Sequence, residues 1–193
     1  MPDADVIIVG GGHNGLICGA YLARSGVDAL VLESRSTVGG CSSTVSDLGT
    51  RFNICSCEHS MIRSMDVIDE LDLVGHGLHY LEADAVNINV FHDGSEPWVQ
   101  FHDVERTIDS LAATYPDQVA GYRRYLADAM PVAELALEIA RTPPATYRFA
   151  GVVAKRARAA ARLLRWSNHS CNDIMDKYFD DWHVTMPSIS HAP

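Results

Sequence analysis

The chain has 193 residues, which allows one domain or one and a half, and its 47% hydrophobic and 21% charged content is typical of a soluble globular protein. Its formal net charge of -10 argues against nucleic acid as a partner, because phosphates repel an acidic body. No apolar run approaches the roughly 18 residues of a membrane span, the N-terminus lacks a signal-peptide pattern, and five unevenly spaced cysteines fit a reducing compartment, so we expect a cytoplasmic protein.

The first predicted elements are a strand, a glycine-rich turn and a helix. Residues 6–9 form a continuous apolar run, as expected of a parallel strand covered on both faces. Gly10 allows a tight turn out of this strand, and Gly12 has no side chain to keep a diphosphate away from the backbone. Gly15 allows the following helix to pack closely on the sheet, and the unpaired N–H groups at the start of that helix favour an anion.

A second predicted strand, residues 29–32, ends in an acid. Glu33 follows Gly15 by eighteen residues, where a carboxylate is able to accept hydrogen bonds from both ribose hydroxyls of a nucleotide. A glycine turn alone is a weak signal, but this one follows a strand, begins a helix and is accompanied by an acid, Glu33, at the end of the second strand. The order predicts a dinucleotide site rather than an ordinary turn.

The stretch after Glu33 distinguishes two kinds of dinucleotide. Gly39 and Gly40 complete a pattern that resembles the E-x-x-x-x-x-G-G extension of FAD-binding oxidoreductases in the glutathione-reductase-like superfamily. An ordinary NAD dehydrogenase has no such loop. The two glycines are expected to bring a second backbone segment against the diphosphate. Arg35 either places charge near that segment or is a solvated surface residue.

A closer resemblance extends from about residue 3 to about residue 130. Residues 10–16, 47–53 and 73–78 together resemble the phytoene-desaturase-related flavoproteins, in the branch labelled pyridine-nucleotide-disulfide-oxidoreductase-domain proteins. The resemblance implies FAD as cofactor, accepting a hydride from a small, largely apolar organic substrate. Together with the motif it gives these expected cofactor-binding residues: Gly10, Gly12, His13, Asn14, Gly15, Glu33, Ser34, Arg35, Gly39, Gly40, Cys41 and Ser42.

Two positions depart from the usual pattern of this family. Cys41 stands where Arg commonly follows the double glycine, and Asn53 stands where Asp commonly follows Phe52.

The expected fold class is α/β: a Rossmann-like FAD/NAD(P)-binding βαβ fold of the glutathione-reductase-like type, incomplete in this chain, with the start of an α+β substrate domain. Three segments are expected. Residues 1–75 bind the ADP moiety of FAD, residues 76–142 form a strand hairpin and helices on the substrate side, and residues 143–193 form a basic helix and an interaction segment.

Members of this family are usually more than twice as long, and the late glycine-rich segment that closes over the flavin has no counterpart here. We therefore expect a subunit of a split FAD-dependent oxidoreductase, desaturase- or dehydrogenase-like, whose flavin and substrate pockets a second polypeptide completes. Three alternatives stay open: a non-enzymatic protein of the same fold that binds an isoprenoid or a protein, an inactive truncated fragment, and an NAD-dependent dehydrogenase domain.

No set of catalytic side chains is recognisable, because neither a G-x-S-x-G elbow nor an H-E-x-x-H helix occurs. Cys55, Cys57 and His59 have metal-ligand spacing, but no second ligand pair accompanies them, so no metal is expected. We expect these cysteines and Cys41 to be small buried thiols lining a pocket wall, with a thiol–flavin adduct as the alternative.

The following elements are predicted from periodicity. A helix covers residues 65–75, strands cover residues 86–91 and 98–101, and a helix over residues 103–115 is capped by Asp103. We expect Trp98 and Phe101 in the core. A further helix begins at Pro116, is kinked at Pro131 and ends near residue 140, before a linker at Pro143–Pro144.

The last part of the chain is predicted to be basic and then amphipathic. Residues 141–166 hold seven basic side chains and no acid, which leaves the rest of the chain at -17. A helix over residues 151–166 either lies on an anionic membrane surface or presents a solvated face, or a face docked on an acidic partner chain. A helix over residues 172–182 is expected to expose apolar side chains to a partner, and residues 186–193 are expected to be a tail.

Overall fold

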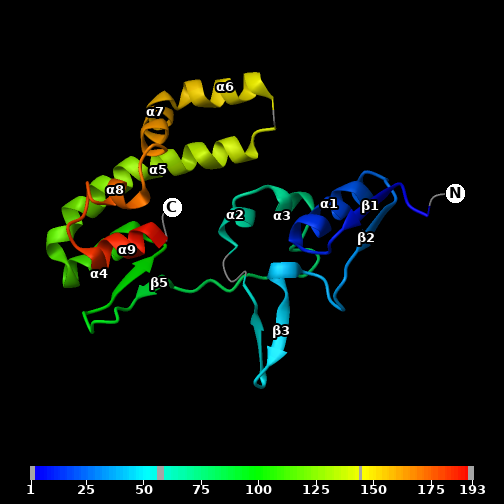
Figure 1. Ribbon diagram of the computed structural model, residues 1–193, viewed down its shortest axis with the longest axis horizontal. Helices are drawn as coiled ribbons and strands as arrows, with labels where there is room; N and C mark the ends of the chain where they lie inside the picture. Colours follow the sequence, from blue (N-terminus) through cyan, green and yellow to red (C-terminus); the bar gives the residue numbers. More distant parts are fainter. Residues whose placement is uncertain (1–2, 56–58, 144, 191–193) are drawn as a thin grey trace. The chain divides into compact units, whose positions relative to one another are not determined.

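The computed structural model describes residues 3–55, 59–143 and 145–190. The chain forms two compact units, residues 1–79 and 80–193, which we name the N-terminal unit and the C-terminal unit. Figure 1 shows the first unit in blue to cyan-green and the second from green to red. Pro144, in the predicted linker, lies outside the described residues.

The N-terminal unit begins with the predicted βαβ arrangement. Strand β1 (Val6–Val9), helix α1 (His13–Arg24) and strand β2 (Ala29–Leu32) follow one another, and the two strands pair in parallel from Val6 with Ala29 to Val9 with Leu32. Parallel pairing requires a crossover, and α1 provides it. The Rossmann-like fold expected of this stretch is therefore present.

Only one face of this two-stranded sheet is covered within the N-terminal unit. Helix α1 packs on one face so closely that a Cβ atom at Gly19 would lie 3.1 Å from the Val31 side chain. On the opposite face Ile7 and Val9 are 59% and 86% exposed, and Leu30 and Leu32 lie beside them in register. The expectation that β1 is covered on both faces is wrong, because α1 covers one face and the side chains of Ile7 and Val9 on the other stay exposed.

The remainder of the N-terminal unit is a short 3-10 turn, a hairpin and two single-turn helices: η1 (Gly40–Ser42), β3 (Thr44–Asp47), β4 (Thr50–Asn53), α2 (Ser60–Arg63) and α3 (Val67–Glu70). The predicted helix over residues 65–75 is wrong in length. It ends at Glu70 because Asp72 adopts a positive φ of 48° and its carboxylate accepts a hydrogen bond from the Gly75 N–H at 3.2 Å.

The C-terminal unit begins with an antiparallel hairpin of β5 (Ala85–Asn89) and β6 (Trp98–Phe101). Helix α4 (Val104–Thr114) packs on β6, and the Asp103 carboxylate accepts a hydrogen bond from the Arg106 N–H at 2.8 Å. The predicted hairpin and the predicted cap are confirmed. Trp98 is fully buried, as expected, and its ring nitrogen donates to the His183 carbonyl at 2.9 Å.

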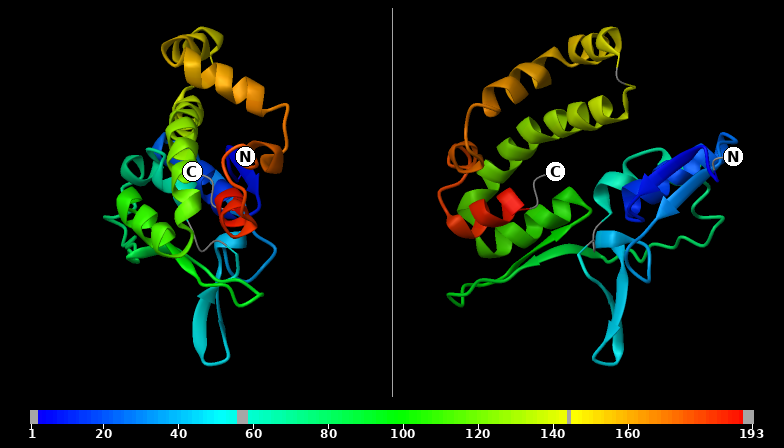
Figure 2. Two further views of the ribbon diagram at one scale, coloured as in Figure 1. Left: turned by 90° about the vertical axis from the view of Figure 1, so that its left-hand side faces the viewer. Right: turned by 45° about the vertical axis from the view of Figure 1, so that its right-hand side comes forward.

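A long helix follows the hairpin layer. After the 3-10 turn η2 (Pro116–Gln118), α5 (Val119–Arg141) runs for 23 residues, and helical structure continues on both sides of Pro131. Figure 2 shows this helix in two further views. Gly121 allows a close approach, because a Cβ atom there would overlap the Tyr178 carbonyl oxygen.

The basic segment forms two helices rather than one. Helices α6 (Thr146–Lys155) and α7 (Ala157–Trp166) meet at Arg156, whose backbone leaves the helical region. Its guanidinium binds Glu134 and Glu138 of α5 at 2.7 Å each. The chain leaves the helical conformation at Arg156, where the side chain contacts both glutamates of α5. The prediction of a single helix over residues 151–166 is therefore wrong.

Part of the basic face is neutralised within the chain. Arg162 of α7 binds the Asp128 carboxylate of α5 at 2.6 Å, and the Tyr178 hydroxyl donates to the same carboxylate at 2.8 Å. Of the three alternatives for the basic segment, docking on an acidic surface is thus met in part within the chain, by α5. Among the described helices, none is long and apolar enough to cross a membrane.

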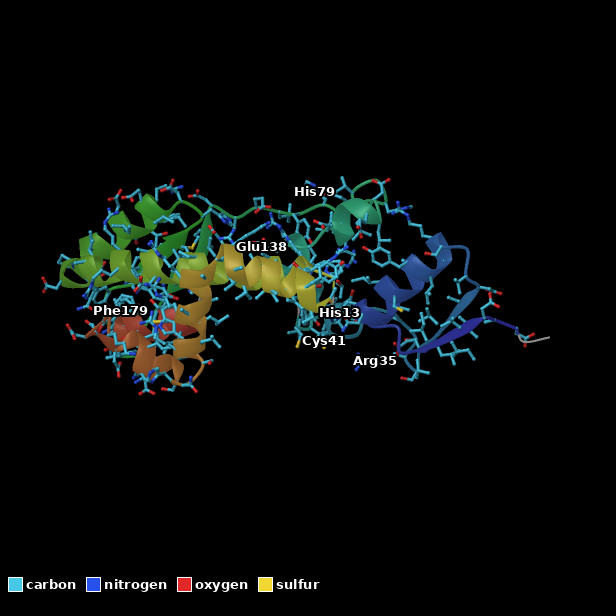
Figure 3. All side chains as sticks on the ribbon, turned by 90° about the horizontal axis from the view of Figure 1, so that it is seen from above. His13, Arg35, Cys41, His79, Glu138 and Phe179 are labelled. Carbon is cyan, nitrogen blue, oxygen red and sulfur yellow. The ribbon has the colours of Figure 1, made fainter. Side chains whose placement is uncertain are left out.

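The end of the chain also folds back into the C-terminal unit. Helices α8 (Cys171–Met175) and α9 (Trp182–Ser190) replace the predicted helix over residues 172–182 and most of the predicted tail. Both predictions are wrong because the apolar residues of this region pack inside the unit, where Phe179 lies in the core (Figure 3). Two clusters form that core: Trp98, Ile108, Leu111, Tyr122, Tyr125, Ala129, Met175, Phe179 and Val184, and Val132, Leu135, Val152, Ala159 and Ala160.

Candidate dinucleotide-binding site

The glycine turn lies where β1 ends and α1 begins. Gly10 adopts a φ of 104°, and its N–H donates to the Leu32 carbonyl at 2.7 Å, so the turn leaves β1 beside the end of β2. A Cβ atom at Gly15 would overlap the Gly10 carbonyl oxygen. Gly15 therefore lets α1 start directly against the turn, as the motif predicted.

Glu33 is fixed at the end of β2 by backbone groups. Its Oε2 accepts a hydrogen bond from the Gly11 N–H at 2.8 Å, and its Oε1 accepts one from the Arg35 N–H at 3.0 Å. These two bonds, that from Arg35 first, hold the pKa of the Glu33 carboxyl below its usual range. The side chain is therefore an ionised acceptor placed beside the glycine turn.

Gly11 is a part of this arrangement that the sequence reasoning missed. A Cβ atom at Gly11 would lie 3.1 Å from the Glu33 Oε2 atom, so any larger residue would disturb the hydrogen bond between them. The signal was present, because three consecutive glycines exceed what the G-x-G-x-x-G pattern needs.

The second glycine pair lies against the first turn, as predicted. The Gly39 N–H donates to the Gly11 carbonyl at 2.7 Å, and Gly12 and Gly39 form an isolated parallel bridge. Gly39 and Gly40 have φ angles of 117° and 58°, and a Cβ atom at Gly40 would lie 3.1 Å from the Gly12 Cα atom. Two backbone segments therefore meet at one place without side chains between them.

The other predicted site residues surround this junction. His13 and Asn14 are exposed at the start of α1, Ser34 and Arg35 are exposed after β2, and Cys41 and Ser42 belong to η1 (Figure 3). Ser43, which is not among the expected cofactor-binding residues, is buried, and its hydroxyl donates to the Val38 carbonyl at 3.3 Å. This bond fixes the loop that carries Gly39 and Gly40.

The start of α1 is suited to an anion. Gly12 is the N-cap, no side chain accepts a hydrogen bond there, and no acidic residue occupies the first turn. The first N–H groups of a helix have no partner within it, and the helix dipole makes this end positive. Together with the side-chain-free junction and the fixed Glu33 carboxylate, the site fits the diphosphate and ribose of an ADP moiety.

Thiols and metal ligands do not gather at this site. Cys41 and Cys55 are free and exposed, so the expectation of buried thiols is wrong for both, because η1 and the β3–β4 hairpin lie at the surface. Cys57 lies outside the described residues. Within the described ranges no group of three or more His, Cys, Asp or Glu side chains is placed to hold a metal ion.

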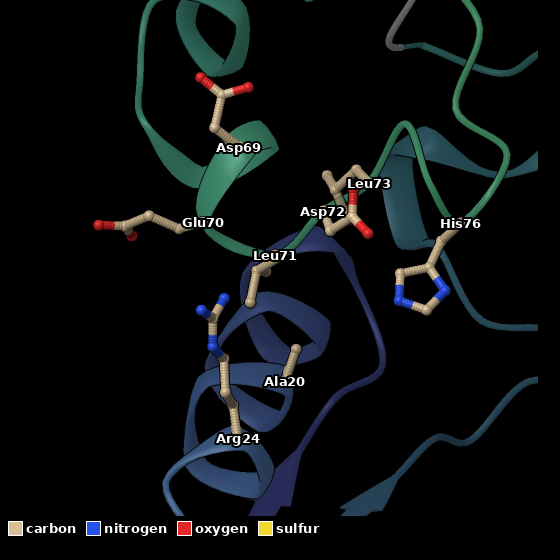
Figure 4. A pocket seen from close by; sticks show the side chains of 8 residues that line it. All are labelled: Ala20, Arg24, Asp69, Glu70, Leu71, Asp72, Leu73 and His76. Carbon is tan, nitrogen blue, oxygen red and sulfur yellow. The ribbon is translucent and has the colours of Figure 1, made fainter.

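A second hollow in the N-terminal unit lies beside the C-terminal half of α1. It has a volume of about 520 Å³, and Figure 4 shows Ala20 and Arg24 of α1 facing Leu71 and the following segment up to His76. The anion-attracting end of α1 lies at the opposite end of the helix, near His13. This hollow is therefore not the nucleotide site.

Comparison with known proteins supports the assignment of this region. Residues 8–71 match the family described as NAD(P)-binding Rossmann-like domain. The chain is 33% identical over 124 residues to one of the subunits of limonene dehydrogenase from Castellaniella defragrans, which is 64% of this chain and 22% of that protein. The resemblance to the N-terminal portion of FAD-dependent oxidoreductases is confirmed. The Rossmann-like domain of this chain thus includes β1, α1, β2 and the second glycine pair.

Two further similarities, one in sequence and one in fold, agree with the resemblance to the N-terminal portion of FAD-dependent oxidoreductases. The chain is 38% identical over 78 residues to pyridine nucleotide-disulfide oxidoreductase domain-containing protein 2 of Mus musculus, which is 40% of this chain and 13% of that protein. A double mutant of putrescine oxidase shares its fold, with a TM-score of 0.55 and 21% identity over 94% of this chain and 35% of that chain. The chain spans less than a quarter of the length of the two curated relatives. These similarities point to a flavin or nucleotide cofactor.

Proposed function

We propose that this chain supplies the ADP-binding half of the flavin site in an FAD-dependent oxidoreductase of the dehydrogenase or desaturase type. One observation carries the proposal. Glu33, held by the Gly11 N–H at 2.8 Å, and the Gly39 segment, held by the Gly11 carbonyl at 2.7 Å, converge on the same glycine turn. Gly11 thereby connects the acceptor for the ribose hydroxyls, Glu33, with the Gly39 segment that is proposed to contact the diphosphate.

Each predicted residue has a role in this proposal. Glu33 accepts hydrogen bonds from the ribose hydroxyls, and the N–H groups at His13 and Asn14 face the diphosphate. Gly12 and Gly40 keep side chains away from it. Ser34, Arg35, Cys41 and Ser42 border the site. The flavin, when bound, supplies the hydride acceptor, and this chain positions it.

FAD is favoured over NAD by the second glycine pair. An ordinary NAD dehydrogenase has no second glycine loop after the ribose acid, whereas here Gly39 returns to pair with Gly12. The names of the relatives, one a dehydrogenase subunit and the other a pyridine nucleotide-disulfide oxidoreductase domain protein, support a redox role with either cofactor.

We infer that a second polypeptide completes the site. The sheet has two strands, and its apolar face, formed by Ile7, Val9, Leu30 and Leu32, is exposed in a fold that normally covers both faces. A parallel sheet with an open apolar face is poorly stabilised until another element packs on it. The limonene dehydrogenase relative is named as one subunit of its enzyme, which agrees with a hetero-oligomer.

The remaining functional assignments are proposals of the same kind. The substrate is a small apolar organic molecule, and the protein acts in the cytoplasm or, through the exposed basic residues of α6 and α7, at a membrane surface. The catalytic residues are expected in the part of the enzyme that contacts the isoalloxazine ring.

A competition experiment tests the ADP-half proposal. FAD bound to the purified chain is titrated with ADP or with FMN, and displacement is followed by removing free ligand and measuring the FAD that stays bound by chromatography. ADP is expected to displace FAD because it carries every group that this site contacts, and FMN is expected not to, because it lacks the adenosine and its ribose. Displacement by FMN but not by ADP would show that this chain binds the FMN half of the cofactor, which would contradict the proposal.

A further inference from the structure

Ser188 of α9 is a buried hydroxyl without a partner. The side chain is 2% exposed, and its Oγ atom is the one buried side-chain polar atom within residues 3–55, 59–143 and 145–190 that has no hydrogen bond. Leaving a buried polar group unpaired costs about 1–3 kcal/mol. The buried hydroxyl of Thr185, on the same helix, does have a partner, because it donates to the Asp181 carbonyl at 3.1 Å.

Ser188 lines a pocket inside the C-terminal unit. The pocket has a volume of about 240 Å³, is lined by residues of β5, β6, α4, α5 and α9 and by His102, and opens to solvent beside Val86, Val104 and Met130. Most of its wall is apolar and comes from Val86, Phe101, Val104, Leu126 and Met130. The hydroxyl without a partner therefore lies beside a hollow and not in packed core.

The other polar residues at this pocket are already engaged. The Thr107 hydroxyl accepts a hydrogen bond from the Phe101 N–H at 2.8 Å, and the Gln100 Oε1 atom accepts one from Asn87 at 3.3 Å. Burial raises the pKa of Tyr122, and it raises the pKa of Tyr125 to about 12, so both phenols stay neutral at physiological pH. Among the lining residues only His102 is able to carry a positive charge, and it lies at an exposed position where its Nε2 atom is 3.9 Å from the Glu82 carboxylate, so the wall around Ser188 offers a ligand no charge.

We propose that this pocket binds a small, uncharged, mainly apolar molecule with one hydroxyl or carbonyl group, which forms a hydrogen bond with the Ser188 Oγ atom. A serine hydroxyl is able to donate to a carbonyl or accept from a hydroxyl. The volume lies between an apolar cavity of about 150 Å³ that holds benzene and the pockets of about 300 Å³ or more that hold drug-sized ligands. The ligand is therefore a single ring or a short branched chain.

This site is separate from the nucleotide proposal. All of its lining residues belong to the C-terminal unit, and none belongs to the glycine turn or to the segment of Gly39 and Gly40. Binding here can be measured whether or not the chain holds FAD.

The test uses two probes of nearly equal shape, cyclohexanol and methylcyclohexane, which differ by a hydroxyl in place of a methyl group. Their affinities for the full chain are measured by saturation-transfer NMR titration. The two probes differ in hydration, so the hydrogen bond to Ser188 is measured by how the ratio of their affinities changes between the wild-type chain and Ser188→Ala.

Ser188→Ala removes the hydrogen bond and leaves the apolar wall. Cyclohexanol affinity is expected to fall roughly three- to tenfold, the value of one neutral hydrogen bond, while methylcyclohexane affinity stays unchanged. The variant is expected to be as stable as the wild type or more stable, because it loses an unpaired polar group. Thr185→Val, on the same helix, removes a satisfied hydroxyl outside the pocket and is expected to lower stability without altering the affinity for either probe.

Two results would overturn the proposal. One is the absence of cyclohexanol binding to the wild-type chain up to the solubility limit, which would mean that water alone satisfies Ser188. The other is an equal loss, or no loss, of affinity for both probes in Ser188→Ala. Filling the pocket by Met130→Trp gives a second check, since binding of both probes should then disappear.

Discussion

At the scale of single residues, the nucleotide site depends on glycines whose hydrogen atoms lie against other atoms of the site. Gly15 faces the Gly10 carbonyl oxygen, Gly11 faces the Glu33 carboxylate, and Gly40 faces the Gly12 Cα atom. At each of these positions a side chain would come too close to a different neighbouring atom. These contacts bring the two glycine segments close enough to act on one diphosphate.

Replacing Gly15 with Ala tests this packing. The new Cβ atom would overlap the Gly10 carbonyl oxygen, so the turn must shift, and we expect a loss of about 1–3 kcal/mol of stability together with at least tenfold weaker ADP binding. Thermal unfolding and an ADP titration measure the two effects.

Gly151→Ala is the matched control. Gly151 lies in α6 with open space around its Cα atom, so the same change there should stabilise the protein by about 0.5–1 kcal/mol and leave ADP binding intact. Equal effects of the two substitutions would contradict the close packing described at Gly15.

At the scale of secondary-structure elements, a histidine joins the β5–β6 hairpin to α9. The His183 Nδ1 atom lies 2.6 Å from Asp181, and its Nε2 atom lies 2.9 Å from Asp93 in the turn of the hairpin. The ring also packs between Tyr115, Phe91 and Trp182. Helix α9 is thereby attached to a hairpin some ninety residues earlier in the chain.

This histidine makes stability depend on pH. Burial of the ring lowers its pKa, but the hydrogen bonds to Asp181 and Asp93 outweigh this effect and raise the pKa of His183 above its ordinary value. The Ser95 N–H and then His183 lower the pKa of Asp93 to about 2. Two other titratable groups lie near this cluster: burial raises the pKa of Tyr115, which therefore stays neutral near neutral pH, and the His92 ring lies 5.6 Å from the Trp182 ring.

The sign of the effect follows from these shifts. A raised histidine pKa contributes stability that is complete below about pH 6.5 and is lost as pH rises through the folded-state pKa. The lowered Asp93 pKa contributes stability above about pH 4 that is lost toward pH 2. Wild-type unfolding free energy, measured by urea denaturation, should therefore fall as the pH rises above about 6.5 and through the folded-state pKa of His183.

His183→Gln should remove most of that slope, and His169→Gln, at an exposed position of the same unit, should retain it. A wild-type stability that is flat over this range would show that the two aspartates do not act on the ring.

Local sequence patterns predicted some elements of this chain well and others badly. The βαβ order, the hairpin and the Asp103 cap follow from residues adjacent in sequence, and all three are present. The break at Arg156 does not follow from local pattern, because it depends on two glutamates of α5 some twenty residues away. The burial of Phe179 and of α9 likewise depends on Trp98 and Tyr122, which no periodicity within the segment reveals.

The candidate site shows the same division. Gly10, Gly12, Gly15, Glu33, Gly39 and Gly40 form a spaced motif, and the structure places them together. Gly11 was missed because its role is a backbone contact with Glu33, a residue distant in sequence. The exposed thiols of Cys41 and Cys55 were mispredicted because composition says nothing about which short loop lies at the surface.

At the scale of the whole molecule, the two units differ in how well each buries its own apolar residues. The C-terminal unit has two core clusters and fully buried Trp98, Leu111, Leu135 and Val184. The N-terminal unit leaves the apolar side chains of one sheet face exposed. The unit that carries the nucleotide motif is thus the one that needs another element, which is the basis for proposing a second polypeptide.

The central claim is that an ADP moiety binds at the glycine turn with its ribose on Glu33. The most direct test is a titration of FAD into the wild-type chain and into Glu33→Gln, which keeps the shape of the side chain and removes its charge, with Glu96→Gln as a control far from the turn in sequence. Hydrogen bonds to a charged group contribute about 1.5–3 kcal/mol, so the account predicts roughly ten- to a hundredfold weaker binding to Glu33→Gln and no change in the control. Equal FAD affinities for wild type and Glu33→Gln, or no FAD binding by the wild-type chain, would contradict it.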